Sequence, residues 1–215
     1  MIKAAEEGEI WEWRAFGRIP ETLRKKIIAL PIRRDLFGRE LANLCGQDLY
    51  LISPASDQNI KLRKAGEGWF LKFKLLLTTE AHSIELYLES EKRTYKFPLK
   101  AAVVEETARL LKTALPEAEI SKSGLDHDAF IDRLAAASPP ISQIHIGKIR
   151  SQYQMKNGWI EVAEVVFPKK KIQSISLHAY ERKAVEAMLE RLKIESYLNA
   201  SLQVMNYIEA CRRWT

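Results

Sequence analysis

The sequence predicts an α+β fold, in which an antiparallel β-sheet or β-barrel carries flanking helices at two places along the chain. Three observations lead to this prediction. Apolar and polar residues alternate with a period of two over many short segments, as expected for strands with one apolar and one polar face. Turn-forming residues separate these segments. Apolar residues with a 3.6-residue period occur in the middle of the chain and again near its carboxyl end, where they predict amphipathic helices.

A β-hairpin over residues 59–76, NIKLRKAGEGWFLKFKLL, has the clearest alternation. On its first arm Lys61 and Arg63 alternate with apolar residues, and on its second arm Lys72 and Lys74 do the same. A Gly-Glu-Gly sequence between the arms provides the turn. Residues two apart on a strand share a face, so the two basic pairs are expected to lie side by side, backed by an apolar face. Such a group of cations is unsuited to a core and well suited to an anion site.

The other strands are predicted from the same alternation. The first, over 9–16 (EIWEWRAF), places Glu12 and Arg14 on one face. Pro98 is expected to end the strand 93–99 or to place it at a sheet edge, because proline cannot donate a hydrogen bond to a neighbouring strand. The remaining predicted strands cover residues 47–52, 83–88, 143–154, 159–167 and 171–178.

Prolines mark several ends of the predicted helices. Pro20 is expected to open the first helix, since proline is well tolerated in a first helical turn, and Pro31 is expected to close it. The segment 32–44 fits either a helical turn or a loop. The last helix is expected either to cap the mouth of the barrel or to mediate a homodimer, and its apolar stripe does not decide between the two. The predicted helices cover residues 20–30, 101–114, 125–137, 181–192 and 196–214.

Composition and charge limit the class of protein. The chain has 215 residues, of which 47% are hydrophobic and 29% charged, so it can form a sizeable core. Its net charge of +6 is small for a nucleic-acid-binding protein and compatible with a phosphate-bearing ligand. An RNA-binding scaffold is therefore the least favoured alternative, and nucleic acid is not expected as a partner.

The amino terminus and the cysteines indicate an intracellular protein. The amino terminus lacks the apolar run of a signal peptide, and no window approaches the roughly 18 apolar residues of a membrane span. Cys45 and Cys211 lie far apart and outside any CxxC motif, which argues against a disulfide and against a zinc site. We expect a cytoplasmic location and no membrane partner.

Pairs of charges two residues apart recur along the predicted strands. A polyphosphate needs several cations from different directions, because each phosphate oxygen takes its own donor. Carboxylates in the same site would hold Mg²⁺ or Mn²⁺, which prefer oxygen ligands. A sheet with one solvated face and a closed barrel with a polar interior both produce this alternation, so alternation alone leaves both interpretations open. The basic residues are Lys61/Arg63, Lys72/Lys74, Lys148/Arg150, Arg14 and Arg93, and the strand carboxylates are Glu12, Glu85, Glu89, Glu161 and Glu164.

The order of these motifs resembles that of the CYTH superfamily, also called the triphosphate tunnel metalloenzymes. Residues 12–14 (EWR) lie where the family has an amino-terminal ExExK strand. Residues 60–63 (IKLR) and 71–74 (LKFK) resemble its basic hairpin, and residues 148–150 (KIR) resemble its later KxR strand. Residues 159–178 resemble its closing strands. Each motif is short, and their order along most of the chain carries the resemblance.

The resemblance implies an antiparallel barrel that encloses a tunnel. It implies one tunnel domain over 1–215, with a helical insertion at about 101–137 and carboxyl-terminal helices at about 181–214. Known activities of the family include inorganic triphosphatase, thiamine triphosphatase, RNA triphosphatase and class IV adenylate cyclase. If the chain is active, the resemblance implies a triphosphatase that depends on Mg²⁺ or Mn²⁺ and uses water as the nucleophile.

The resemblance also assigns roles to individual residues. Glu12 and Glu161 would be the catalytic carboxylates that hold metal, with Glu85 and Glu89 as further metal ligands. The cations would neutralise the phosphates of a small anionic ligand. The implied phosphate-binding residues are Arg14, Lys61, Arg63, Lys72, Lys74, Arg93, Lys148 and Arg150.

Four positions depart from the family pattern. Ile10 stands where the ExExK strand has its first acid, and Arg14 replaces its lysine. Ala163 stands where a second in-phase acid is expected, and His178 replaces a glutamate. His178 is itself expected to be a packed or surface residue and not a metal ligand. The basic half of the motif set is thus better preserved than the acidic half. This difference favours the alternative of a non-catalytic module that binds an anionic ligand or a protein partner on the same barrel.

Overall fold

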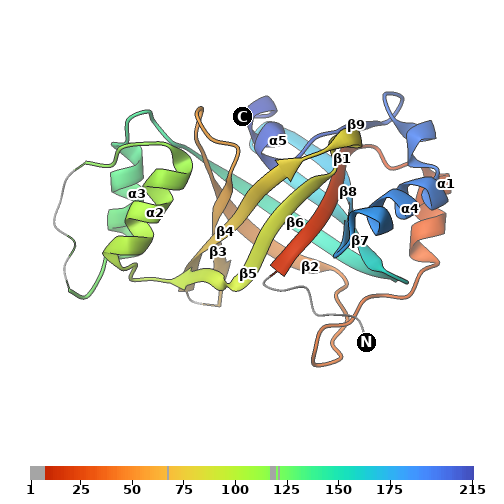
Figure 1. Ribbon diagram of the computed structural model, residues 1–215, viewed down its shortest axis with the longest axis horizontal. Coiled ribbons are helices and arrows are strands. Elements are labelled where there is room, and N and C mark those ends of the chain that lie inside the picture. Colours follow the sequence, from red (N-terminus) through yellow and green to blue (C-terminus); the bar gives the residue numbers. More distant parts are fainter. Residues whose placement is uncertain (1–7, 67, 117–119, 121) are drawn as a thin grey trace.

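Eight antiparallel strands close into a barrel in the computed structural model, which describes residues 8–66, 68–116, 120 and 122–215 (Figure 1). The strand order is β5-β4-β3-β2-β6-β7-β8-β1, and β1 pairs again with β5 to complete the ring. A short ninth strand extends the far end of β1. The strands are β1 (Glu9–Gly17), β2 (Leu44–Ile52), β3 (Asn59–Ala65), β4 (Gly68–Thr79), β5 (Glu85–Lys96), β6 (Ser142–Met155), β7 (Gly158–Phe167), β8 (Lys170–Ala179) and β9 (Leu202–Val204). The α+β barrel predicted from the sequence is confirmed.

Helices cover the outside of the barrel in two groups (Figure 1). The pair α2 and α3 packs over β3 and β4, and the pair α1 and α4 lies at the opposite side, over β1, β7 and β8. The helices are α1 (Glu21–Ile28), α2 (Ala101–Leu111), α3 (His127–Ala135), α4 (Arg182–Leu192) and α5 (Tyr207–Arg213), and two 3₁₀ turns are η2 (Ala81–Ser83) and η3 (Ile194–Tyr197). Among the described residues, no helix has the length and apolar character needed to cross a membrane.

Helices α2 and α3 pack against the apolar face of the predicted basic hairpin. Ile60 and Leu62 of β3 are fully buried and belong to one apolar cluster with Leu111 of α2 and Phe130 of α3. Burial of each such side chain stabilises the fold by roughly 1.5–3 kcal/mol. Because successive residues of a strand point to opposite faces, this packing directs the alternate, basic residues of β3 into the barrel. The middle residue of the predicted turn, Glu67, lies outside the described residues.

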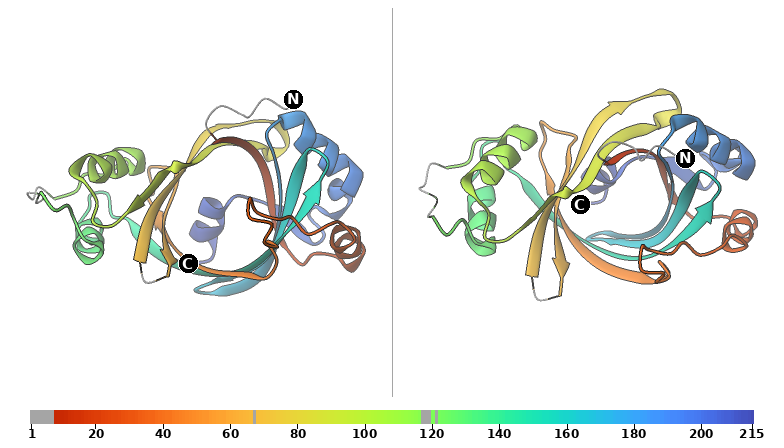
Figure 2. Two further views of the ribbon diagram at one scale, coloured as in Figure 1. Left: turned by 90° about the horizontal axis from the view of Figure 1, so that it is seen from below. Right: turned by 60° about the horizontal axis from the view of Figure 1, so that its bottom comes forward.

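Helix α5 closes one end of the barrel. Seen from below in Figure 2, it lies inside the outline of the ring at the far end. Tyr207 and Ile208 of α5 are buried in a cluster with Tyr50 of β2 and Phe16 of β1. A capping box fixes the start of the helix: the Asn206 side chain accepts a hydrogen bond from the backbone N–H of residue 209, whose carboxylate accepts one from the Asn206 N–H. Of the two roles expected for this helix, the structure shows the cap.

Two sequence-based boundaries need correction, and one open choice is decided. The predicted strands 83–88 and 93–99 form one strand, β5, because β4 pairs with both parts through a register shift, in which the partner changes from Thr94 at Lys72 to Glu89 at Lys74. The predicted helix 196–214 is helical only from Tyr207 to Arg213, because residues 202–204 pair with β1 as a strand. The ambiguous segment 32–44 is mostly a loop, held by isolated bridges that include Ile32 to Tyr153.

Candidate functional site

A cavity of about 370 Å³ lies inside the barrel. Side chains from β1, from β3 to β8, and from α5 line it. Its lining is dominated by positive charge: the described cationic residues on it are Arg14, Arg33, Lys61, Arg63, Lys72, Lys74, Lys148 and Arg150. Seven of these belong to the predicted phosphate-binding set, and Arg33 is new.

The basic side chains of the hairpin point inward and are shielded from solvent. Lys61 of β3 and Lys74 of β4 are each 7% exposed. A solvated sheet face, which the alternation alone left open, is thereby excluded at these positions. The polar interior of a closed barrel accounts for the pattern instead.

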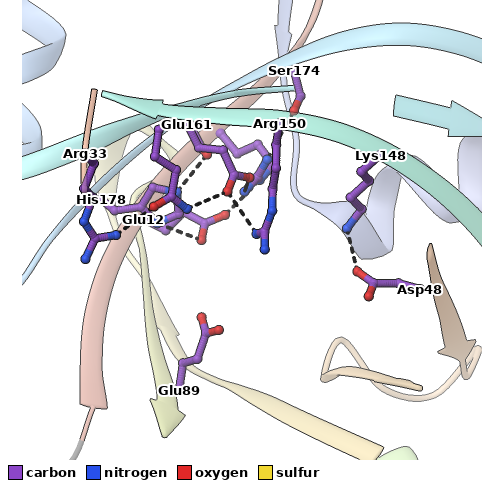
Figure 3. Close-up of polar contacts among 12 residues, drawn as sticks. Glu12, Arg33, Asp48, Glu89, Lys148, Arg150, Glu161, Ser174 and His178 are labelled. Carbon is purple, nitrogen blue, oxygen red and sulfur yellow. Dashed lines mark hydrogen bonds and ion pairs between the residues drawn. The ribbon is translucent and has the colours of Figure 1, made fainter. Parts of the chain in front are cut away.

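One group of contacts lies behind the cavity lining, around the buried Asp48 of β2. Its Oδ1 accepts a hydrogen bond from Arg63 Nε at 2.8 Å, and its Oδ2 lies 3.0 Å from Lys148 Nζ and 3.2 Å from Lys61 Nζ. We call these four residues the Asp48 cluster; Figure 3 shows the ion pair between Lys148 and Asp48. The hydroxyl of Tyr50 accepts a further hydrogen bond from Lys148 Nζ at 2.6 Å. Three cations thus share one buried carboxylate.

The pKa values of the Asp48 cluster show the effect of this crowding. Burial raises the pKa of Asp48, but Lys61, Lys148 and Arg63 overcome burial and hold it well below the usual range. For Lys61 the balance is opposite. Burial, together with the like charges of Lys148 and Arg63, holds the pKa of its ammonium well below the usual value, and Asp48 only partly offsets them. The cluster lacks negative charge.

A second group of contacts lies across the cavity, around Arg14 of β1. Arg14 Nε donates to Glu12 Oε1 at 2.8 Å, and Arg14 Nη2 lies 3.7 Å from Glu161 Oε1. His178 Nδ1 lies 3.3 Å from Glu12 Oε2. Strand register explains the grouping, because Ser176 of β8 pairs with Arg14 on one side and with Glu161 on the other. We call Glu12, Arg14, Glu161 and His178 the Arg14 cluster; Figure 3 labels its two carboxylates and His178.

Cations outweigh burial at both carboxylates of the Arg14 cluster. Burial raises the pKa of Glu12, but Lys74, Arg14 and His178 hold it far below the usual range. Burial likewise raises the pKa of Glu161, whereas Arg150 and Arg14 lower it to about 2. Both carboxylates are therefore charged at neutral pH.

His178 is packed, as expected from the sequence. Its ring stacks on Trp159 with centroids 5.0 Å apart, and its Nε2 lies 2.8 Å from Ser176 Oγ. Burial lowers the pKa of His178 to about 4, although Glu12 opposes this shift. The imidazole is therefore neutral at pH 7.

Glu89 of β5 stands between the two clusters. Its Oε1 accepts a hydrogen bond from Lys72 Nζ at 2.5 Å, and its Oε2 lies 3.5 Å from Lys74 Nζ. Lys74 also pairs with Glu12 Oε2. Lys74 thus links Glu89 to the Arg14 cluster.

Three predicted site residues do not line the cavity: Glu12, which is buried behind Arg14 and Lys74, and Arg93 and Glu85. Thr94 of β5 lines it and is the Cα partner of Lys72, so the neighbouring Arg93 points to the outer face. Glu85 contributes to a separate cavity of about 190 Å³, where its two oxygens accept hydrogen bonds from Asn206 Nδ2 at 2.7 Å and from a tyrosine hydroxyl at 2.8 Å. Arg93 is thus not placed to bind phosphate, and Glu85 is not placed to share a metal with Glu161.

Two residues of the site were missed in the sequence. Arg33 lies in the loop before β2, where no alternation marks a direction; its guanidinium lies 4.0 Å from the ring centroid of Trp159 and donates to Gln152 Oε1 at 2.8 Å. Asp48 did carry a signal, because Asp48 and Tyr50 alternate with leucines in the predicted strand 47–52.

Comparisons with known proteins bear on the fold. No family model matches the sequence, and no curated protein matches it. Among solved structures, a candidate adenylate cyclase of Bacillus halodurans is similar with a TM-score of 0.50 and 14% identity, over 96% of this chain and 98% of that chain. The chain shares the closed antiparallel barrel of this structure, which is the fold that the resemblance to the CYTH superfamily implied.

Two further solved structures are similar to the tunnel. A protein of Pyrococcus horikoshii has a TM-score of 0.49 at 14% identity, covering 92% of this chain and 98% of that chain. A Hippeastrum protein, a candidate adenylyl cyclase with a dominant triphosphatase activity, has a TM-score of 0.49 at 12% identity, covering 95% of each chain. At these identities the likeness concerns the fold alone.

The acids of the tunnel do not fit an open divalent-metal site. Within the part of the chain that the structure describes, no group of three or more His, Cys, Asp or Glu side chains is arranged to hold a metal ion. Both oxygens of Glu12 and the Oε2 of Glu161 already accept hydrogen bonds, and His178 Nε2 contacts Ser176 Oγ. Glu161 Oε1, which lies 3.7 Å from Arg14 Nη2, accepts none among the described residues. The metal roles that the resemblance implied for Glu12 and Glu161 therefore have one open ligand position, fewer than a divalent ion needs.

Proposed function

We propose that the tunnel binds a triphosphate-bearing anion. The observation that carries this proposal is the Asp48 cluster, in which three cations that line the cavity, Lys61, Arg63 and Lys148, share one buried carboxylate. Buried charges without a counter-charge are costly. An anion in the cavity would supply the missing negative charge and accept the N–H groups that now crowd around Asp48.

Cations on other strands support a ligand with several phosphates. Lys72 and Lys74 of β4, Arg150 of β6 and Arg33 of the loop face the same cavity as the Asp48 cluster. Donors that converge from different strands suit an anion whose oxygens point in several directions. A single phosphate would reach only part of this surface. The likeness in fold to a candidate adenylate cyclase agrees with a ligand of this class.

Binding is tested by titrating the full chain with inorganic triphosphate in isothermal titration calorimetry. We expect Lys61→Met and Lys148→Met each to raise the Kd by roughly 10- to 100-fold, because each removes a charge-assisted contact worth about 1.5–3 kcal/mol. Lys64→Met is the matched control, because Lys64 lies on the same strand and is exposed. Failure of the wild-type chain to bind triphosphate, or equal losses in Lys64→Met, contradicts the proposal.

Turnover is a separate question from binding. The tunnel residues proposed to contact phosphate are Arg33, Lys61, Arg63, Lys72, Lys74, Lys148 and Arg150. Catalysis through metal held by Glu12 and Glu161 stays a prediction from the resemblance, and the occupied donor atoms weigh against it. Release of phosphate from inorganic triphosphate, ATP and thiamine triphosphate, each with Mg²⁺ or Mn²⁺, separates an enzyme from a binding module.

A further inference from the structure

We propose that Arg14 takes the place of a divalent metal ion between Glu12 and Glu161, so that the tunnel holds its polyphosphate in metal-free form. This inference rests on the proposed function, since it concerns the form in which the same ligand is bound. It follows from the contacts of Arg14, from the donor atoms around it and from the surplus of cations elsewhere in the tunnel.

The guanidinium of Arg14 is fixed on several sides. Its Nε contacts Glu12, its Nη2 faces Glu161, and its Nη1 donates to Ser174 Oγ at 3.3 Å. The ring of Tyr207 from α5 covers the group, with its centroid 4.4 Å from the guanidinium carbon. Arg14 is only 5% exposed. A fixed cation that bridges two carboxylates from different strands fills the role that a divalent ion has in an acidic site.

Three of the four carboxylate oxygens that a metal would need already accept hydrogen bonds. Glu12 Oε1 faces Arg14, while its Oε2 faces Lys74 and His178. The second oxygen of Glu161 lies 3.2 Å from Arg150 Nη1 and accepts a hydrogen bond from Gln152 Nε2 at 3.0 Å. His178 Nε2 is engaged by Ser176.

A metal ion could enter only by breaking these contacts. Displacing Arg14 and Lys74 from Glu12 would take from two buried cations their closest carboxylate, which is strongly unfavourable. The residue two positions before Glu12 is Ile10, which lines the cavity and offers no replacement ligand.

The rest of the tunnel removes the need for a metal counter-charge. A divalent ion bound to a polyphosphate neutralises part of its charge and occupies some of its oxygens. In this tunnel the Asp48 cluster, with Lys72 and Arg150, presents fixed cations to those oxygens. Mg²⁺ in solution therefore competes with the tunnel for the same phosphate oxygens.

The test compares binding of inorganic triphosphate in EDTA with binding in excess Mg²⁺, by isothermal titration calorimetry on the full chain. We expect a Kd in EDTA that is no larger than the apparent Kd with Mg²⁺. Electron paramagnetic resonance of Mn²⁺ added to the ligand-free protein is expected to show no bound ion. Binding of triphosphate that requires Mg²⁺, or stoichiometric Mn²⁺ binding by the free tunnel, overturns the inference and leaves the proposed function standing. Absence of triphosphate binding in both solutions overturns the proposed function, and this inference with it.

Variants of Arg14 test its part directly. Arg14→Gln frees the facing oxygens of Glu12 and Glu161, so we expect it to gain Mn²⁺ binding, whereas the matched control Arg14→Lys keeps the cation and gains none. A folded Arg14→Gln protein that still binds no Mn²⁺ contradicts the role given to Arg14. If Arg14→Gln does not fold, the Glu12→Gln/Arg14→Gln double variant, which removes both charges, serves as the folding control, and the wild-type titrations decide.

Discussion

The Asp48 cluster and the Arg14 cluster lie in the same barrel and have opposite charge balances. In the Asp48 cluster three cations share one carboxylate, whereas in the Arg14 cluster two carboxylates share Arg14 and are further paired with Lys74 and Arg150. In the Asp48 cluster the cations outnumber the carboxylates, so their N–H groups can also bind an anion. In the Arg14 cluster each carboxylate is paired with cations of the protein itself. The contrast separates the part of the tunnel that recruits a ligand from the part that holds its own charges in place.

The largest expected effect comes from removing the single carboxylate of the first cluster. Asp48→Asn removes this counter-charge from two buried cations, Lys61 and Lys148, and from the partly exposed Arg63, so we expect it to lower the free energy of unfolding by about 3–5 kcal/mol. Inorganic triphosphate should restore more stability to this variant than to the wild type, because it supplies the missing charge. Urea unfolding with and without triphosphate measures both effects.

Glu164→Gln is the matched control for Asp48→Asn. Glu164 pairs with Lys171 at 3.2 Å on the exposed surface, where an ion pair contributes at most about 1 kcal/mol. Equal destabilisation by the two substitutions would contradict the claim that Asp48 neutralises the cations around it.

Low pH is expected to destabilise the protein through the Arg14 cluster, because its carboxylates become protonated. The folded pKa of Glu161, about 2, lies below the ordinary value of 4.5, so its contribution is complete above pH 4.5 and is lost as pH falls towards 2. The difference corresponds to about 3 kcal/mol of stability. We expect Glu161→Gln to flatten the loss of stability between pH 5 and pH 3, as measured by urea unfolding. An unchanged slope in the variant would show that Glu161 is not held charged by Arg150 and Arg14.

The smallest expected effect is a linkage between pH and ligand affinity at Lys61. The pKa of Lys61 lies well below its usual value because burial, Lys148, Arg63 and Lys72 outweigh Asp48, and a bound polyphosphate would raise it. Over the pH range in which Lys61 titrates, binding therefore takes up a proton at this site, and affinity falls as pH rises, by no more than about tenfold per pH unit for one proton. Calorimetry in buffers of different ionisation enthalpy measures the proton uptake.

Lys61→Arg provides the control for this linkage. Arginine stays charged across the same range, so the difference in proton uptake between wild type and variant removes the titration of the phosphate itself. Equal uptake by both proteins would exclude Lys61 as the source.

Period-two alternation predicted which side chains share a face, including Glu12 with Arg14 and Lys61 with Arg63, but left open whether that face is solvated or lines a barrel. It did not predict where along a strand the cavity begins and ends. It also did not predict how a register shift changes the side of the strand on which a residue lies. Glu85 was therefore placed in the site although Asn206 of α5 holds it elsewhere, and Arg93 was placed there although the shifted β4–β5 pairing turns it outward.

The alternation of residues could not predict which segments far apart in the sequence come into contact. Asp48 and Lys148 meet because β2 and β6 are neighbours in the barrel, and Arg33 reaches the cavity from a loop without periodicity. The sequence pattern also did not predict that Glu12 and Glu161 both pair with Arg14. Alternation placed Glu12 and Arg14 on one face, but only the pairing of β1 and β7 with β8 brings Glu161 to the other side of the guanidinium.

A crystal structure grown with inorganic triphosphate and Mg²⁺ tests the central contrast most directly. The account predicts phosphate oxygens about 2.7–3.2 Å from the side-chain nitrogens of Lys61, Arg63 and Lys148, with Arg14 still between Glu12 and Glu161. A metal ion ligated by Glu12 and Glu161 with Arg14 displaced, or triphosphate bound away from the Asp48 cluster, would contradict it.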